Sequence, residues 1–382
     1  MNQFPLLFRQ QSKNVPDWVW QSTEDFLPMV SKLDTRPLQL DLARFMGNGL
    51  EQLDQKIIDA KAALAELLAV STNLIDDNSN LVPRVISTLP TELIDEANAK
   101  LARYQQLSRL RRQWGVQTLS RYPHDSLNRV LLYGEHRIWS SISGRMSAAH
   151  PNTMAIPKMI LPYLGSSSGG ELIKVDVQEA EIRLLAGMSA DPALINVFES
   201  GGDLYADGAQ VLYQTGQVNN VQRNVAKRAI IGIIYGQQQQ SLTHTLTKTD
   251  FSLDVDAAQR LFEWLRCHYD TTMHFLDFVA RDQKLWLAGK RTDLVGLGLS
   301  TTQRRVIPVQ SAMAKLLKQF ILMLDEQGLD VIEAQHDAVF ITGNQVFERV
   351  RESMEYLLIQ SFDCLEFRVP YEHEKLLSIE KV

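Results

Sequence analysis

The sequence predicts an α+β fold, because long helical patterns and short buried strands occupy different parts of the chain. Apolar residues recur at alternating three- and four-residue steps through residues 50–67, which is the pattern of a long packed helix. "ELIKVDVQ" at 171–178 is typical of a buried strand, and "LDVIEAQHDAVFITG" at 329–343 of strand, tight turn and strand. Residues 191–285 are mainly helical in pattern.

The region that begins at Leu38 predicts a helical arm. "DDNSN" at 76–80 ends its first helix, and a second helix follows Pro90. The pair predicts two antiparallel helices, whose far end carries a basic cluster: Arg103, Arg109, Arg111 and Arg112. Each arginine alone is typical of a solvated face, and the cluster favours phosphate contact if a nucleic-acid site lies nearby. Residues 1–37 have no clear periodicity and are interpreted as an extended arm.

Composition indicates a large globular protein of two or three subdomains. The chain has 382 residues, 45% of them hydrophobic, and a formal net charge of −6, which argues against indiscriminate coating of nucleic acid. Cys267 and Cys364 lie far apart and match no metal-binding spacing, so we expect a reducing, cytoplasmic location. The start lacks a signal-peptide pattern, and we expect no stretch apolar and long enough to span a membrane.

Two aspartates at predicted strand ends are the candidate metal ligands. Asp176 ends "LIKVD", and Asp337 lies in the turn "QHDA". Each alone is typical of a strand cap or a turn, but a sheet can bring them side by side. Two like charges at that distance are costly unless a cation lies between them. Mg²⁺ suits such a site, and two ions can clamp both oxygens of a phosphoryl displacement.

The stretch "RNVAKRAIIGIIYG", residues 223–236, predicts a helix that binds a nucleotide lengthwise. Four residues spaced four apart share one face: Arg223, Lys227, Ile231 and Tyr235. Asn219 or Asn220 can cap the start, where the helix dipole adds to the two cations as an anion site. We expect a triphosphate at the cationic end, with sugar and base further along. Gly232 and Gly236 would leave room for a base or a template strand.

These stretches together resemble the family A DNA polymerases, the polymerase I family. Residues 175–205 look like its motif A, residues 223–236 like motif B and residues 334–341 like motif C. Three further stretches match less specific segments of the family: "SGRMSAAHPNTMAIP" at 143–157, "RVIPVQ" at 305–310 and "RFMGNGLEQLD" at 44–54. All occur in the family's order, from about residue 40 to 375.

The resemblance implies a role for each matching residue. The metal ligands would be Asp176, Asp337 and the carbonyl of Val177, holding two Mg²⁺ with Mn²⁺ as a substitute. Nucleotide-binding residues would be Arg223, Lys227, Ile231, Tyr235, Glu181 and Tyr205. Among these, Lys227 would also donate a proton to pyrophosphate, and Glu181 would exclude a 2′-hydroxyl. The residues that contact DNA would be Arg145, Asn152, Gln310 and His336.

The resemblance also implies a right-handed polymerase architecture. The palm would comprise 131–190 and 296–382, the fingers 191–295 and the thumb 38–130, after the arm at 1–37. About 37 residues precede the thumb and no Asp-x-Glu exonuclease start is found, so we expect neither proofreading nor 5′-nuclease activity. The implied partners are primed DNA, dNTPs and replication or repair accessory proteins, with the chain a monomer.

Several positions depart from the family pattern. Motif A usually reads D-Y-S-Q-x-E, whereas residues 176–181 read "DVQEAE". Further departures are Ile231 in place of a ring, Tyr205 for histidine, Ala338 for a carboxylate, Val306 for asparagine, and Met154-Ala155 for a Gln-Asn pair. Three alternatives therefore stay open. These are a catalytically inactive DNA-binding or scaffold protein, a single-subunit RNA polymerase or primase-like enzyme, and an unrelated helical α/β enzyme. Glu181 argues against the RNA polymerase.

Overall fold

The structure is a computed structural model that confirms the α+β class. It describes residues 26–77, 81–138, 141–166, 170–249, 253–282, 284–287, 290–293, 298–335, 337–342, 348–355 and 377–381. These residues form two compact units. The smaller unit contains residues 38–132 and 156–167, and the larger unit contains the described residues of 1–37, 133–155 and 168–381. Residues 156–167 are therefore in the same unit as residues 38–132.

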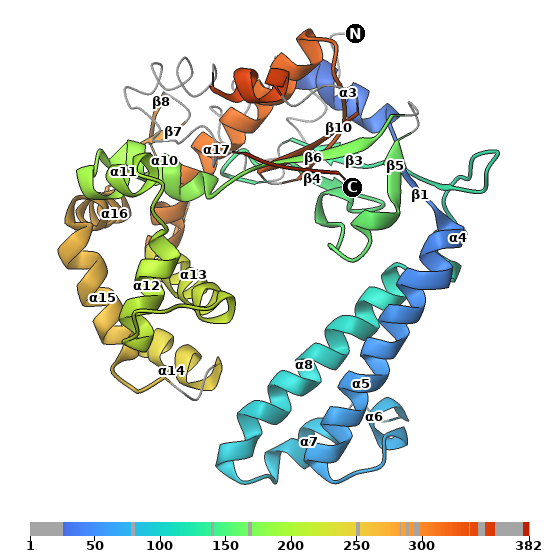
Figure 1. The fold of residues 1–382 in the computed structure, drawn as a ribbon, viewed down its shortest axis with the longest axis horizontal. Coiled ribbons are helices and arrows are strands. Elements are labelled where there is room, and N and C mark those ends of the chain that lie inside the picture. The colour runs from blue at the N-terminus through green and yellow to red at the C-terminus, as the bar shows by residue number, and fades with distance from the viewer. Residues whose placement is uncertain are drawn as a thin grey trace. The chain divides into compact units, whose positions relative to one another are not determined.

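A four-stranded antiparallel sheet forms the centre of the larger unit (Figure 1). Its strands are, in order, β11 Leu377–Lys381, β6 Leu172–Val177, β10 Ala338–Thr342 and β9 Asp330–Gln335. β9 and β10 pair as the predicted hairpin, and β6 is the predicted buried strand. All five side chains of β10 are buried, which explains its uninterrupted apolar sequence.

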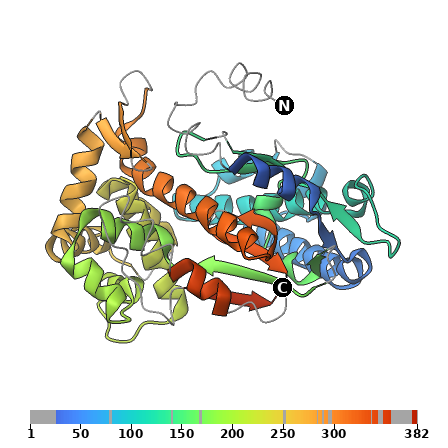
Figure 2. The same cartoon turned by 90° about the horizontal axis from the view of Figure 1, so that it is seen from above.

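The helix α17, Thr301–Glu326, packs against β9, α10 and α16 in the same unit (Figure 2). It begins in a capping box between Ser300 and Gln303 and continues through Pro308. By length and composition α17 could cross a membrane, contrary to the sequence-based expectation. However, 67% of its most apolar window is buried inside the protein, as in a core helix.

In the described residues seven helices follow β6, and the last six confirm the helical pattern predicted for residues 191–285. They are α10 Ala180–Ser189, α11 Pro192–Glu199, α12 Leu204–Tyr213, α13 Asn220–Ile234, α14 Gln239–Thr249, α15 Ala257–His268 and α16 Asp270–Arg281. Asp191 and Asp203 accept two backbone hydrogen bonds each at the starts of α11 and α12. A hairpin of β7, Lys284–Leu287, and β8, Lys290–Asp293, follows α16.

The interpretation of residues 1–37 as an extended arm is wrong for α3, Leu27–Thr35. Phe26, Met29 and Leu33 are buried in the core of the larger unit. The nine residues of α3 are too few to show a helical period in the roughly 11 to 18 residues over which such a pattern is recognised. Residues 1–25 lie outside the described part. The larger unit also contains the hairpin of β3, Glu135–Arg137, and β4, Ser147–Ala149, and the short helix η3, Thr153–Ala155.

The smaller unit consists of a three-stranded sheet and a pair of long helices. In the sheet, β1 Leu38–Leu40 lies between β2 Val130–Leu132 and β5 Leu164–Ser166. The helical elements are α4 Leu42–Arg44, the π-helix η2 Phe45–Leu50, α5 Glu51–Leu68, α6 Asn73–Asp77, α7 Leu81–Ser87, α8 Thr91–Gln113, α9 Val116–Leu119 and η4 Leu161–Tyr163.

The predicted pair of antiparallel helices is confirmed as α5 and α8 (Figure 1). Leu64 and Ala97 share a buried cluster near one end, and Arg111 pairs with Asp54 at 2.6 Å nearer the other. One member of the predicted basic cluster is thus engaged within the unit itself.

Candidate active site

The two predicted metal-binding aspartates lie on neighbouring strand ends of the central sheet. Ala338 is the register partner of Asp176, and the backbone N–H of Val177 donates to the carbonyl oxygen of Asp337 at 3.1 Å. Antiparallel pairing thereby brings together two residues that are far apart in sequence. His336 lies outside the described residues.

Positive and negative groups surround this pair. Lys174, two residues before Asp176 and on the same face of β6, donates from Nζ to Asp176 Oδ2 at 2.9 Å. The carboxyl of Glu181 is close enough to Asp337 to feel its charge. Burial and then Asp337 raise the pKa of Glu181, while Arg145 opposes the shift. The site is therefore rich in carboxylate and contains built-in cations.

The donor chemistry of the two aspartates fits Mg²⁺. This ion takes oxygen ligands and is usually held by one or two carboxylates together with water and substrate phosphates. The described residues contain no cluster of three or more histidine, cysteine, aspartate or glutamate side chains arranged to hold a metal. A site of this kind would therefore depend on oxygens supplied by water and substrate.

The nucleotide-binding face predicted for α13 is half-buried and lies between the exposed positions of the helix, which include Asn224 and Arg228, and its buried face. Asn219 rather than Asn220 caps the helix, in a capping box with Gln222. Arg223, Lys227 and Ile231 are half-buried, and so is Tyr235 at the C-cap. The opposite face enters the core through Val225, Ala226, Ala229, Ile230, Ile233 and Ile234.

Local structure explains why glycine occupies positions 232 and 236 near the end of α13. A Cβ on Gly232 would lie 2.3 Å from the side-chain oxygen of Gln237, so that side chain occupies the space predicted for a base or a template strand. Gly236 has a φ of +88°, which glycine adopts more readily than other residues.

Arg223 is held by two carboxylates and a ring. Its Nε donates to Asp203 Oδ2 at 2.6 Å, its Nη2 donates to Glu179 Oε1 at 3.3 Å, and its Cζ lies 5.2 Å from the ring centre of Tyr205. The hydrogen bond that Arg223 donates to Asp203 is the main cause that raises the pKa of Arg223. Burial and the charge of Asp203 raise the pKa of Glu179.

The buried ring of Tyr205 contacts both cations of α13. Lys227 Nζ, like Arg223 Cζ, lies 5.2 Å from the ring centre of Tyr205, and Tyr205 is 1% exposed. Burial raises the pKa of its hydroxyl, with Glu179 adding to the shift. Tyr205, predicted from the sequence as a nucleotide-binding residue, is therefore buried, and the two cations lie over its ring.

Glu181 connects α10 to both α13 and the segment before β4. Its carboxylate accepts hydrogen bonds from the Tyr235 hydroxyl and from Arg145 Nη2. With Glu179 bound to Arg223, both ends of the predicted face of α13 contact the segment that directly follows Asp176.

The segment that carries Arg145 is fixed by α17. Ser311 Oγ donates to the carbonyl of Ser143 at 3.0 Å, and Lys318 Nζ donates to the carbonyl of Gly144 at 2.9 Å. Gln310, half-buried, precedes Ser311 on the same helix. Lys318 was not among the residues identified from the sequence, although it lies seven residues after Ser311 on the same, otherwise apolar stripe.

Asn152 is exposed and lies just before η3. Gln335 Nε2 donates to the backbone oxygen of Thr153 at 2.8 Å, so this turn is joined to the end of β9. Asn152 therefore lies close to the hairpin turn that contains Asp337.

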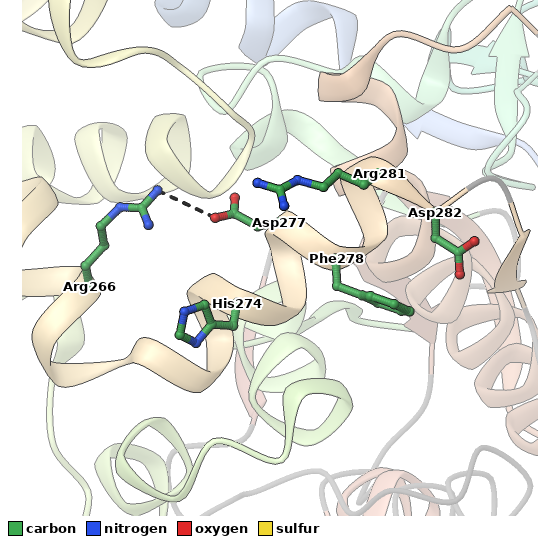
Figure 3. A pocket seen from close by; sticks show the side chains of 6 residues that line it. All are labelled: Arg266, His274, Asp277, Phe278, Arg281 and Asp282. Carbon is green, nitrogen blue, oxygen red and sulfur yellow. Dashed lines mark ion pairs between the residues drawn. The ribbon is translucent and has the colours of Figure 1, made fainter.

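A separate cavity of about 660 Å³ lies between α15 and α16 (Figure 3). It is lined by Arg266, His274, Asp277, Phe278, Arg281 and Asp282, none of which the sequence analysis selected. Asp277 pairs with Arg266 at 3.6 Å and with Arg305 at 2.8 Å, so its charge is compensated internally. We assign no ligand to this cavity.

Comparison with solved structures defines the class of fold. The protein is similar to the polymerase domain of Pol1 from M. smegmatis, solved in complex with a DNA primer-template and dNTP, with a TM-score of 0.66 and 17% identity. The match covers 90% of this chain and 66% of that one. The fold is that of a polymerase domain. The family model of DNA polymerase family A matches residues 51–328, and the chain belongs to this family.

Curated relatives are DNA polymerases I. The chain is 24% identical to DNA polymerase I of Aquifex aeolicus over 261 residues, which cover 65% of this chain and 45% of the relative. It is 21% identical to the thermostable DNA polymerase I of Thermus aquaticus over 360 residues, which cover 91% of this chain and 40% of the relative. The chain thus spans less than half the length of these proteins.

Proposed function

We propose that the chain is a template-directed DNA polymerase that extends the 3′ end of a primer with dNTPs. The observation that carries the proposal is that Asp176 and Asp337 lie at adjoining strand ends, while Glu179 and Glu181, which follow Asp176, bind Arg223 and Tyr235 of α13. Family membership and the polymerase-domain fold support it.

In this proposal Asp176, Asp337 and the Val177 carbonyl hold two Mg²⁺ ions, with Mn²⁺ as a substitute. Bound there, the ions would neutralise charge on the attacking oxygen, the α-phosphate and the leaving pyrophosphate. Arg223 and Lys227 bind the triphosphate, and Lys227 gives a proton to the pyrophosphate. Closure of α13 over the nucleotide excludes water and aligns the reactants.

The same proposal assigns selection of the nucleotide to the other end of α13. Ile231 and Tyr235 contact sugar and base, and Glu181 excludes a 2′-hydroxyl by occupying its space. An isoleucine packs less closely on a sugar than a ring does, so selection by contact is looser here. Tyr205 contributes indirectly, through the two cations that lie over it.

DNA would be bound by residues at the edge of the site. Arg145 and Gln310 sense the minor groove, where correct base pairs share similar acceptors, while Asn152 and His336 lie beside the primer. The thumb (38–130), palm (131–190 and 296–382) and fingers (191–295) keep the ranges expected from the sequence. We also propose a monomer that works in the cytoplasm in DNA replication or repair, without proofreading by this chain.

Primer extension on a defined template tests the proposal. The wild-type protein with Mg²⁺ and all four dNTPs should extend the primer, and Asp176→Asn and Asp337→Asn should each lower the rate by at least about a thousandfold. Asp256→Asn, which removes the same charge from an exposed site, should retain wild-type extension.

The outcomes separate the alternatives. DNA binding without extension by the wild-type protein would indicate the inactive DNA-binding protein. Preference for rNTPs would indicate the RNA polymerase or primase-like enzyme. Removal of a mismatched 3′ nucleotide by the purified chain would contradict the expected absence of proofreading.

A further inference from the structure

Glu179 occupies an unusual place at the start of α10. Its backbone is left-handed, with φ +54°, and its side chain is 15% exposed. It stands at the N-cap position but makes no side-chain capping hydrogen bond. Among the described residues, its carboxylate instead accepts a hydrogen bond from Arg223. The carboxylate is thus free of the structural role that its position would normally give it.

Asp203, the second carboxylate on Arg223, differs in this respect. It caps α12 by accepting hydrogen bonds from the backbone N–H groups of Tyr205 and Ala206, both at 3.0 Å. Removal of Asp203 would therefore disturb the start of a helix. Glu179 is also a departure from the family pattern, in which motif A has a neutral glutamine at this position. Glu179 therefore gives this chain one negative charge more than the family pattern has at this position.

The charge of Glu179 lies where a triphosphate would need positive potential. It pairs with Arg223 at 3.3 Å, and its electrostatic interactions also include Asp203, Arg183 and Lys227. An anion that approaches Arg223 must displace this carboxylate or bind beside it. Either event weakens binding of the anion. Displacement breaks the ion pair between Glu179 and Arg223, and binding beside Glu179 places two negative charges together in a half-buried site.

We propose, on the basis of the proposed function, that the carboxylate of Glu179 competes with the triphosphate of the incoming nucleotide for the guanidinium of Arg223. It holds the guanidinium until the triphosphate takes its place, and so it sets the affinity for the incoming nucleotide. A neutral side chain of the same shape would leave Arg223 with Asp203 and the ring of Tyr205, still oriented toward the anion.

The test uses Glu179→Gln, which keeps the size of the side chain and removes the charge. Binding of inorganic tripolyphosphate to the protein is measured by calorimetry, and KM for dNTPs by primer extension. We expect tripolyphosphate to bind about three- to tenfold tighter and KM to fall by a similar factor, as loss of a partly exposed ion pair and of a like charge implies. The gain should shrink at high salt.

Two further variants keep the result interpretable. Glu263→Gln removes one negative charge from an exposed site on α15 and should leave tripolyphosphate affinity as in the wild type. Glu179→Gly also removes the carboxylate and is compatible with the left-handed backbone, so it should reproduce the tighter binding. Thermal unfolding of each variant checks that the fold is retained.

The possible outcomes differ for the two proposals. Unchanged or weaker tripolyphosphate binding by both Glu179 variants, with folding intact, would overturn the competitor role and show that Glu179 serves to orient Arg223. Tighter binding combined with no primer extension by the wild-type protein would support the competitor role and overturn the proposed function.

Discussion

Lys174 Nζ lies 2.9 Å from Oδ2 of Asp176, on the same face of β6. The two side chains are largely shielded from solvent, with 17% and 28% exposed, so the pair is less screened than one on an open surface. The ammonium neutralises a carboxylate that would otherwise face Asp337 without compensation. In the proposed enzyme this lysine competes with the metal for Asp176.

We therefore predict that Lys174→Met lowers the Mg²⁺ concentration for half-maximal primer extension by about two- to fivefold, the range expected for one ion pair. Titration of extension rate against Mg²⁺ measures this. Lys158→Met, at an exposed site, is the charge-matched control. An unchanged or higher Mg²⁺ requirement in Lys174→Met alone would contradict the competition.

Glu181 should control the choice of sugar. Its carboxylate is held between Tyr235 and Arg145, so it has a defined position rather than a mobile one. We predict that Glu181→Ala raises the ratio of rATP to dATP incorporation by about tenfold or more, because the space for a 2′-hydroxyl opens. Tyr235→Phe should raise it less. Identical ratios in wild type and Glu181→Ala would refute this role.

Lys318 should act as a positioning residue for Arg145. We predict that Lys318→Met slows primer extension by about tenfold, because the Gly144 carbonyl loses its donor and the neighbouring Arg145 shifts. Lys315→Met, three residues earlier and half-buried, is the control. The defect should be larger still on primers with a mismatched end or altered minor groove, and an equal defect in Lys315→Met would indicate general damage to α17.

The charge of Lys318 also predicts a pH dependence. Burial lowers its pKa to about 7, below the 10.5 of an ordinary lysine. The unfolded chain binds more protons between these values, so the contribution of Lys318 to stability increases as pH rises from about 7 toward 10.5. Lys318→Met should remove this increase, as measured by thermal unfolding at several pH values.

His136 predicts a pH effect of opposite sign. It lies buried between Asp34, at 2.8 Å from its Nδ1, and Glu333, at 2.6 Å from its Nε2. Burial alone would lower the pKa of His136, but the hydrogen bonds to Asp34 and Glu333 raise it to about 9, above the ordinary 6.5. The charged imidazole therefore stabilises the fold fully below pH 6.5, and this contribution is lost as pH rises through about 9.

The charged imidazole of His136 should stabilise the folded state by about 3 kcal/mol, as calculated from the difference between its pKa of about 9 in the folded protein and the ordinary 6.5. Chemical denaturation of the wild-type protein and His136→Gln at pH 6 and pH 9.5 measures it. The difference in stability between the two proteins should be large at pH 6 and small at pH 9.5. A difference independent of pH would mean that the imidazole is not charged in the folded protein.

Local features of the site could be predicted from the sequence. The apolar run ending at Asp176 predicted β6, and the strand-turn-strand pattern around Asp337 predicted the β9–β10 hairpin. The four-residue spacing that begins at Arg223 identified the face of α13 that stays out of the core. These predictions succeed because the spacing of apolar residues reflects which side of a helix or strand is buried.

Contacts between distant segments were decided by the tertiary structure. Nothing in the sequence indicates that Arg223 meets Glu179, that Tyr235 meets Glu181, or that His136 is enclosed by two acids. The sequence likewise does not indicate that Tyr205 is buried with Arg223 and Lys227 over its ring. The sequence by itself determined the elements, their exposed faces and the residues able to perform the chemistry. Their partners depend on how strands and helices far apart in the chain pack, because a side chain's neighbours are set by the fold and not by its position along the chain.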